Sequence, residues 1–334
     1  MQNNRPDQKL GVLLVNLGTP DTPDQGSIRR YLKEFLSDPR VVEVPRLIWW
    51  VVLNLVILRF RPRKLVPDYQ KIWQGEQSPL RKITKGQVSK LQTALDSNLG
   101  QGKIVVKPAM TYGNPSFETA FADMKAEGVE KVLVLPLYPQ YSATTTAASY
   151  DAMSRTLAKI RNIPEIRFIK RYHRHDKYIH ALAESVKAHW AKLGRQAKLF
   201  ISFHGIPEEY VAKGDPYAAD CLETTELLVN YLGLNSDEWL HCYQSRVGTK
   251  EWLKPYTDDS MKSLGKENQA GLDVICPGFS ADCLETLEEI DGENREYFEQ
   301  NGGSDYHYIS ALNDGDLHID LLADLVKSNI DGWL

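Results

Sequence analysis

A histidine that follows an apolar segment is the first residue whose type and place suit chemistry. His204 comes directly after Leu199–Phe203 and is followed by Gly205 and Pro207, residue types that shape a tight turn. In open α/β sheets, ligands bind beyond the carboxyl ends of the strands. An imidazole placed there titrates near neutral pH and can act as a base or as a metal ligand. We predict that His204 is functional; a core histidine with a satisfied hydrogen bond is the alternative.

A group of carboxylates follows a second apolar segment, Leu272–Cys276. Glu285, Glu289 and Glu293 are four residues apart, so they share one face of a helix, and Asp282 lies three residues before the first of them. Acidic rows are commonly solvated helix faces, and that alternative stays open for this row. Glu285 differs because it lies in the first turns of the predicted helix, nearest the strand end. We therefore predict that Glu285 is the second functional residue.

Eight short apolar segments have to position these residues, and stretches with helical periodicity separate them. The segments are Gly11–Leu17, Ile104–Met110, Val132–Leu137 and Ile166–Ile169, then Leu199–Phe203, Trp239–Tyr243, Leu272–Cys276 and Tyr306–Ile309. Strands that are apolar throughout belong to sheets covered on both faces. We predict an α/β protein with two similar Rossmann-like, doubly wound domains. Each is expected to be a four-stranded parallel sheet flanked by helices, with a cleft between the domains.

The expected domains are residues 8–172 and 173–334, because the polar stretch Arg171–Lys177 closes the first set of strands. The last helix, expected at 316–330, could pack on either domain. An insertion at residues 40–77 in the first domain is longer than a connector needs, and such insertions are usually functional.

Within this insertion lies the run Leu47–Leu58, here called the apolar lip, which contains Trp49 and Trp50. It is about a dozen residues long, short of the about 20 that a membrane-spanning helix needs. One interpretation is a core helix with a basic end. The other is an amphipathic segment that touches a membrane surface, because cations follow the run directly and would face anionic headgroups. Those cations are Arg59, Arg61, Arg63 and Lys64.

Composition excludes several classes of protein. The 40 Lys and Arg against 44 Asp and Glu give a net charge of −4, so the chain lacks the broad basic surface that nucleic acid requires. Its 4 cysteines form no CxxC pair, which favours a reducing, cytoplasmic location over a disulfide framework or a zinc site. The first residues show no secretion signal, so none is expected. No GxGxxG or Walker pattern follows a strand, which disfavours a nucleotide or NAD enzyme.

Motifs along nearly the whole chain, from about Gly11 to Val326, resemble the ferrochelatase family of bacterial type. In family order they are NLGTPD at Asn16–Asp21, FLSDPRVV at Phe35–Val42, SPL at Ser78–Leu80, YPQYS at Tyr138–Ser142, HGIP at His204–Pro207, GDPY at Gly214–Tyr217, QSRVG at Gln244–Gly248 and FSADCLETLEE at Phe279–Glu289. The resemblance implies a lyase that inserts Fe²⁺ into protoporphyrin IX, releasing two protons and forming protohaem. This is the last step of haem biosynthesis.

The resemblance places the family's catalytic and metal-binding histidine and glutamate at His204 and Glu285. The chemistry agrees, because inserting the metal displaces two pyrrole protons and needs a base near the ring. A mixed nitrogen and oxygen site can also hold Fe²⁺ without the tight grip of thiolates. The resemblance also implies that the acidic row forms a path for metal or protons through Asp282, Glu289 and Glu293. In the family, the helix that carries this row contains a wide, π-type turn.

The same resemblance implies three porphyrin-binding aromatic side chains, namely Tyr138, Tyr243 and Phe279, although each could equally be a core residue. The apolar lip corresponds to the family's membrane-associated rim, which implies peripheral contact at the inner face of the cell membrane.

Some relatives carry a [2Fe–2S] cluster held by a cysteine in the YPQYS segment and three more in a C-terminal extension. Here the first position is Ala143 and the sequence ends at Leu334, so we expect no cluster and no tightly bound cofactor. A cobalt chelatase and a non-catalytic tetrapyrrole or metal carrier are the competing functions.

Overall fold

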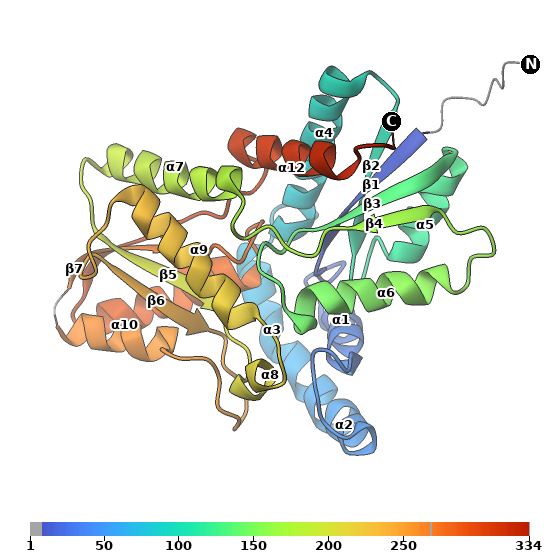
Figure 1. The fold of residues 1–334 in the computed structure, drawn as a ribbon. Helices are drawn as coiled ribbons and strands as arrows, with labels where there is room; N and C mark the ends of the chain where they lie inside the picture. The colour runs from blue at the N-terminus through green and yellow to red at the C-terminus, as the bar shows by residue number, and fades with distance from the viewer. Residues whose placement is uncertain (1–8, 268, 334) are drawn as a thin grey trace, which may run out of the picture. The chain divides into compact units, whose positions relative to one another are not determined.

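The computed structural model describes residues 9–267 and 269–333, which form two four-stranded sheets of parallel strands with helices on their faces (Figure 1). The chain divides into two compact units. Unit 1 holds residues 9–138, Ala143–Arg171 and 314–333, and unit 2 holds Pro139–Ser142 and Tyr172–Asn313. The prediction of two Rossmann-like α/β domains is confirmed.

The sheet of unit 1 has the strand order β2-β1-β3-β4. The strands are β1 (Lys9–Asn16), β2 (Ile104–Met110), β3 (Val129–Pro136) and β4 (Glu165–Phe168), and neighbours pair in parallel. Nearly every residue of β1 is buried, because helices cover both faces of the sheet.

Two pairs of helices provide this cover in unit 1. α4 (Pro79–Leu99) packs against α12 (Asp316–Asn329), and α5 (Phe117–Ala126) packs against α6 (Ala148–Leu157), which the short π-helix η2 (Ala143–Ala147) precedes. The last helix is therefore counted with unit 1, one of the two placements that the sequence allowed.

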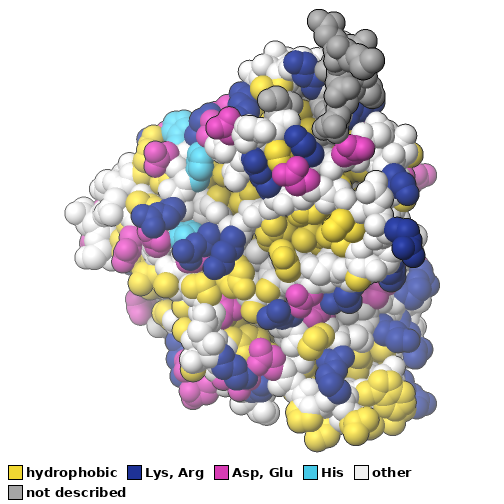
Figure 2. Space-filling model, turned by 45° about the vertical axis from the view of Figure 1, so that its right-hand side comes forward, with side chains coloured by type: hydrophobic (Ala, Val, Ile, Leu, Met, Phe, Trp, Pro, Cys, Tyr) yellow, Lys and Arg dark blue, Asp and Glu magenta, His cyan; other side chains and the backbone are white. Residues whose placement is uncertain are grey.

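The insertion in unit 1 is helical. After α1 (Gln25–Ser37) it forms α2 (Arg46–Val52), the π-helix η1 (Leu53–Ile57) and α3 (Leu58–Ile72). No residue of α2 is buried, so the interpretation of the apolar lip as a core helix is wrong for residues 47–52, while Leu53 and Leu58 further along the lip are buried. Hydrophobic side chains gather at the lower end of the molecule in Figure 2, the level at which Figure 1 places α2. Among the described residues, no helix is long and apolar enough to cross a membrane.

The sheet of unit 2 repeats the pattern with the strand order β6-β5-β7-β8. Its strands are β5 (Lys198–His204), β6 (Trp239–Gln244), β7 (Ala270–Ile275) and β8 (Ser304–Ile309). α7 (Asp176–Leu193) packs on α9 (Tyr217–Leu232), and α10 (Thr257–Lys266) packs on α11 (Arg295–Gln300). The short helix α8 (Glu208–Ala212) follows β5, and the π-helix η3 (Glu285–Asn294) runs directly into α11.

Candidate functional site

His204 is the last residue of β5, at the carboxyl end of a central strand of unit 2. The side chain is half-buried, and its Nδ1 lies 2.7 Å from the carbonyl oxygen of Gly205. Because a carbonyl only accepts hydrogen bonds, Nδ1 carries the proton of the neutral ring. The lone pair of Nε2 is then left to accept a proton or bind a metal.

The tight packing around the residue after His204 favours glycine. A Cβ atom on Gly205 would lie 3.0 Å from the carbonyl oxygen of Gln244 and 3.2 Å from the ring of Trp252. The Gly205 amide meanwhile donates to that same carbonyl at 2.8 Å. This close approach of backbone to backbone fixes the turn that sets the direction of His204.

His204 shares its face of the sheet with polar side chains. Ser202 lies two residues earlier and therefore points to the same side as His204. Its hydroxyl donates to Gln244 Oε1 at 2.9 Å and lies 2.9 Å from the hydroxyl of Thr257, the first residue of α10. This is the face that α10 covers.

Glu285 is the first residue of η3 and is half-buried. Gln244, which is directly opposite His204 in the strand pairing, donates from Nε2 to the carbonyl oxygen of Glu285 at 3.1 Å. The fully buried Gln244 amide thus links the strand of His204, through Ser202, to the helix that carries Glu285. Both predicted residues therefore lie at the same edge of one sheet.

Side chains bind several carbonyl groups of the π-helix that carries Glu285. Asn294 donates to the Glu289 carbonyl at 2.8 Å, and Tyr306 of β8 donates to the Ile290 carbonyl at 2.7 Å. Such support favours a π-helix, whose hydrogen bonds run over five residues and which often occurs at functional sites.

Glu289 lies one turn further along η3 and is held by the end of β6. Ser245 donates to Glu289 Oε2 at 2.6 Å, and Gln244 Nε2 lies 3.5 Å from the same oxygen. Burial raises the pKa of Glu289 to about 7; the hydrogen bond from Ser245 opposes the rise, and the negative charge of Glu285 adds to it. Glu289 therefore exchanges a proton near neutral pH.

This raised pKa predicts a pH-dependent stability. In the unfolded chain a glutamate has a pKa of about 4.3, so the folded state holds the Glu289 proton more tightly than the unfolded state does. The free energy of unfolding of the protein therefore falls as pH rises from about 4 to about 7. We expect Glu289→Gln to remove this fall. Urea unfolding at pH 5 and pH 8 measures it, with the exposed Glu293→Gln as control; equal pH dependence in Glu289→Gln and wild type would contradict the prediction.

Glu293 and Asp282 lie at the two ends of the acidic row. Glu293 is exposed and accepts a hydrogen bond from the hydroxyl of Tyr297. Asp282 is buried, and its carboxylate accepts hydrogen bonds from Thr286, Tyr308, the amide of Ala311 and the side chain of Asn313, at 2.7–3.2 Å. The acidic row thus extends from a buried carboxylate at Asp282 to a solvent-exposed carboxylate at Glu293.

The aromatic side chains expected to bind porphyrin do not gather around His204 within unit 2. Tyr243 pairs with Phe203, so by strand alternation it points to the opposite face from His204, and there its ring meets His241 edge-on at 4.8 Å. Phe279 is half-buried in the loop after β7 and packs on the core of unit 2. Tyr138 is a buried residue of unit 1.

Gln244 and Ser245 are the functional candidates that sequence reasoning missed. Both stand in the QSRVG motif, which carried the family resemblance without a role for either residue. Ser245 has a φ of 68°, a left-handed conformation that is uncommon outside glycine and asparagine. Only the fold shows that this turn aims its hydroxyl at Glu289.

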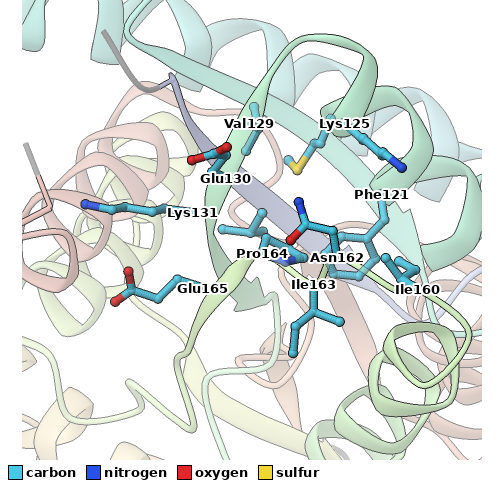
Figure 3. A pocket seen from close by; sticks show the side chains of 12 residues that line it. Phe121, Lys125, Val129, Glu130, Lys131, Ile160, Asn162, Ile163, Pro164 and Glu165 are labelled. Carbon is cyan, nitrogen blue, oxygen red and sulfur yellow. The ribbon is translucent and has the colours of Figure 1, made fainter. Parts of the chain in front are cut away.

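Other groups outside this site have structural partners. His173 Nε2 lies 2.7 Å from Glu223, and the His175 side chain caps the start of α7. Across the described residues, no group of three or more His, Cys, Asp or Glu side chains is arranged to hold a metal ion. A hollow of about 360 Å³ in unit 1 is lined by the end of α5, the start of β3 and the loop that leads into β4, and none of the candidate residues lines it (Figure 3).

Comparison with known proteins shows which family the sequence matches. The sequence model of the family described as Ferrochelatase matches residues 9–330. A protein named Ferrochelatase from Thioalkalivibrio sulfidiphilus is 52% identical over 97% of this chain and 88% of its own length. Another from Alcanivorax borkumensis is 50% identical over 98% of this chain and 96% of its own length.

Solved structures resemble the chain in fold. SirB from Bacillus subtilis with Fe³⁺ has a TM-score of 0.56 at 11% identity, covering 97% of each chain. CbiX, described as the terminal enzyme for biosynthesis of siroheme in denitrifying bacteria, has a TM-score of 0.52 at 9% identity, covering 96% of this chain and 99% of its own.

Proposed function

This chain belongs to the ferrochelatase family, and from that premise we propose that it inserts Fe²⁺ into protoporphyrin IX to form protohaem. The observation that carries the proposal is the convergence of His204 and Glu285 at one edge of the unit 2 sheet, joined through the buried amide of Gln244. Both substrates are taken up and both products are released: Fe²⁺ and the porphyrin enter, the porphyrin exchanges two pyrrole protons for the metal, and haem and the two protons leave.

His204 supplies the base. The hydrogen bond from Nδ1 to the Gly205 carbonyl leaves Nε2 as the accepting atom, so a pyrrole proton has one defined place to go. Glu285 supplies a carboxylate oxygen near the same edge of the sheet. Nε2 of His204 and a Glu285 oxygen together hold Fe²⁺ loosely enough for transfer to the four ring nitrogens. Nε2 accepts a pyrrole proton only while it is not bound to the metal, and it passes the first proton on before it accepts the second.

Glu289 and Glu293 extend the site toward solvent as a path for protons or hydrated metal. Glu289 suits this role because burial brings its pKa to about 7, so it takes up and loses protons under physiological conditions. Glu293 is exposed and lies at the solvent end of the row. Asp282 was expected in the same path, and its four hydrogen-bond donors support a different role, argued below.

The porphyrin contacts stay a prediction. Phe279 is the best supported of the three, because it is half-buried in the loop after β7, at the strand edge that carries His204. Tyr138, at the end of β3 in unit 1, and Tyr243 are buried.

The proposal includes no [2Fe–2S] cluster. The position of the first cluster cysteine in relatives is Ala143, and all four cysteines are buried. Burial raises the pKa of Cys242 to about 12 and raises that of the other three thiols well above its usual value, which disfavours the thiolate form that a cluster ligand needs.

Anaerobic incubation of the purified protein with protoporphyrin IX and Fe²⁺ tests the function. We expect catalytic conversion to protohaem, identified by its absorption and mass, with two protons released per haem. Co²⁺ with a precorrin-type substrate serves as the comparison. Spectral binding of porphyrin without turnover would make the protein a carrier, and turnover only with Co²⁺ would make it a cobalt chelatase.

We also propose that the apolar lip rests on the inner face of the cytoplasmic membrane. Most of its large apolar side chains are exposed, with Leu47 at 86% and Trp50 at 63%, whereas Leu53 and Leu58 are buried and hold the lip to the protein. The lip is anchored to α1 by Trp49, whose indole donates to the Leu36 carbonyl at 2.6 Å. The four cations after it are exposed, and no acidic residue lies between Glu43 and Asp68, which favours anionic headgroups.

Two acidic substitutions in the apolar lip should weaken its binding to membranes. We expect Leu47→Glu/Trp50→Glu to lose about tenfold or more of its binding to vesicles rich in phosphatidylglycerol, since apolar insertion drives such association. Co-sedimentation measures it, with Leu222→Glu, an exposed leucine of α9, as matched control. Wild-type protein that stays in the supernatant with anionic and zwitterionic vesicles alike would overturn the membrane proposal.

A further inference from the structure

A residue just before the helix of Glu285 is paired with the residue at which the chain leaves unit 2. Asp282 lies three residues before Glu285, and Asn313 is the last residue of unit 2. The Asp282 amide donates to Asn313 Oδ1 at 2.8 Å, and Asn313 Nδ2 donates to Asp282 Oδ2 at 2.7 Å. This two-bond pairing is called the Asp282–Asn313 latch.

The other carboxylate oxygen of Asp282 is equally engaged. Oδ1 accepts from the Tyr308 hydroxyl at 2.7 Å, from Thr286 Oγ1 at 3.1 Å and from the Ala311 amide at 3.2 Å. Burial and the charge of Asp282 raise the pKa of Tyr308, so its hydroxyl keeps the proton that it donates. These donors come from η3, from β8 and from the loop after β8.

The Asp282 carboxylate is held in one position by these hydrogen bonds, and the same bonds restrain the residues that donate them. Its four donors are directed at both oxygens, and only 6% of the residue is exposed. A metal path needs oxygens that can be offered to passing ions, whereas these oxygens are committed to hydrogen bonds. Thr286 extends the restraint into the helix, because it also accepts from the Cys283 amide at 3.0 Å.

We infer that Asp282 and Asn313 are positioning residues: the latch ties the start of the Glu285 helix to the connection through which the chain passes from unit 2 to α12. Asp314, the next residue, pairs with Lys90 of α4 at 3.2 Å, so the connection is held in unit 1 as well. Asn313 has a φ of 48°, a conformation that asparagine and aspartate tolerate better than most residues. This inference rests on the proposed function, since it assigns residues that place Glu285 for metal insertion.

An exchange of the two side chains tests the latch. Asp282→Asn sets two NH₂ groups against each other, and Asn313→Asp sets two carboxylates against each other. The double variant Asp282→Asn/Asn313→Asp restores the pairing with the charge on the other residue. The new amide at position 282 keeps an oxygen for Tyr308, Thr286 and Ala311, and its NH₂ donates to the new carboxylate at position 313. The backbone conformation suits both residue types at position 313.

The expected result is loss and rescue. We expect each single variant to lower kcat by about 10- to 100-fold, as misplacement of a catalytic group does, and the double variant to return to within about threefold of wild type, as coupled partners do. Melting temperature and amide hydrogen exchange over residues 282–290 should follow the same pattern. Asn98→Asp, on an exposed residue of α4, is the control for adding a carboxylate.

Two outcomes would overturn the latch. A double variant that melts and exchanges like wild type but stays inactive would show that the negative charge itself is needed at Asp282, as a path requires. A double variant no more protected than the singles would show that the pairing does not hold the helix. If the wild-type protein did not turn over, the proposed function would fall, while the exchange pattern would still decide whether the latch fixes the helix.

Discussion

His204→Ala is expected to lower kcat for haem formation by at least about 100-fold, since a positioned general base contributes about 10² to 10⁴ to a rate. The reason is geometric: Nδ1 is committed to the Gly205 carbonyl, so Nε2 is the single nitrogen that can take a pyrrole proton. Steady-state assays with protoporphyrin IX and Fe²⁺ measure the loss.

A matched histidine controls for the substitution itself. His180 of α7 is half-buried and bonds the Tyr231 hydroxyl through Nδ1, and His180→Ala should stay close to wild type. Added imidazole should restore part of the His204→Ala rate if His204 acts as a base. A His204→Ala rate within threefold of wild type would remove His204 from the mechanism.

Glu285→Gln is expected to have the second largest effect, a fall in kcat of about 100-fold, which corresponds to about 2.7 kcal/mol of barrier. The amide keeps the volume and leaves the hydrogen bond from Gln244 to the Glu285 carbonyl in place, because that bond is to the backbone. The variant therefore removes the charge and little else. The Michaelis constant for Fe²⁺ should rise while that for porphyrin changes little.

Glu296→Gln provides the comparison, because Glu296 is an exposed glutamate on the helix that follows η3. Measuring both Michaelis constants for the two variants separates loss of a metal ligand from a general loss of charge on this helix. Unchanged kinetics in Glu285→Gln, or equal losses in both variants, would argue against a specific role for Glu285.

Most of the fold could be predicted because parallel strands covered on both faces are apolar along their length. All eight apolar segments are strands. β8 begins at Ser304, two residues before the predicted start at Tyr306, because Ser304 and Asp305 are polar and exposed at the edge of the sheet and hydrophobicity alone does not include them. The exposed apolar lip was one of two interpretations, since composition does not distinguish a buried apolar run from an exposed one.

Site residues could be predicted from the sequence only where they lie at or after the carboxyl end of a strand. His204 and Glu285 follow strands, and strand ends meet at one edge. Ser245 and Asn313 lie far from their acidic partners in sequence, and their polar types are common in loops, so nothing in the chain links them to Glu289 and Asp282. Tyr243 was predicted to bind porphyrin, and only the pairing of β5 with β6, which the sequence does not reveal, places its side chain on the face opposite His204.

Single-turnover mixing tests the central claim most directly. Protein saturated with protoporphyrin IX is mixed anaerobically with excess Fe²⁺, and absorption follows the porphyrin as it becomes haem, for wild type beside His204→Ala. We predict full conversion by wild type, while His204→Ala binds the porphyrin and leaves it unmetallated over the same time. Wild-type protein that binds porphyrin without converting it, or a variant that converts it as fast, would contradict the account.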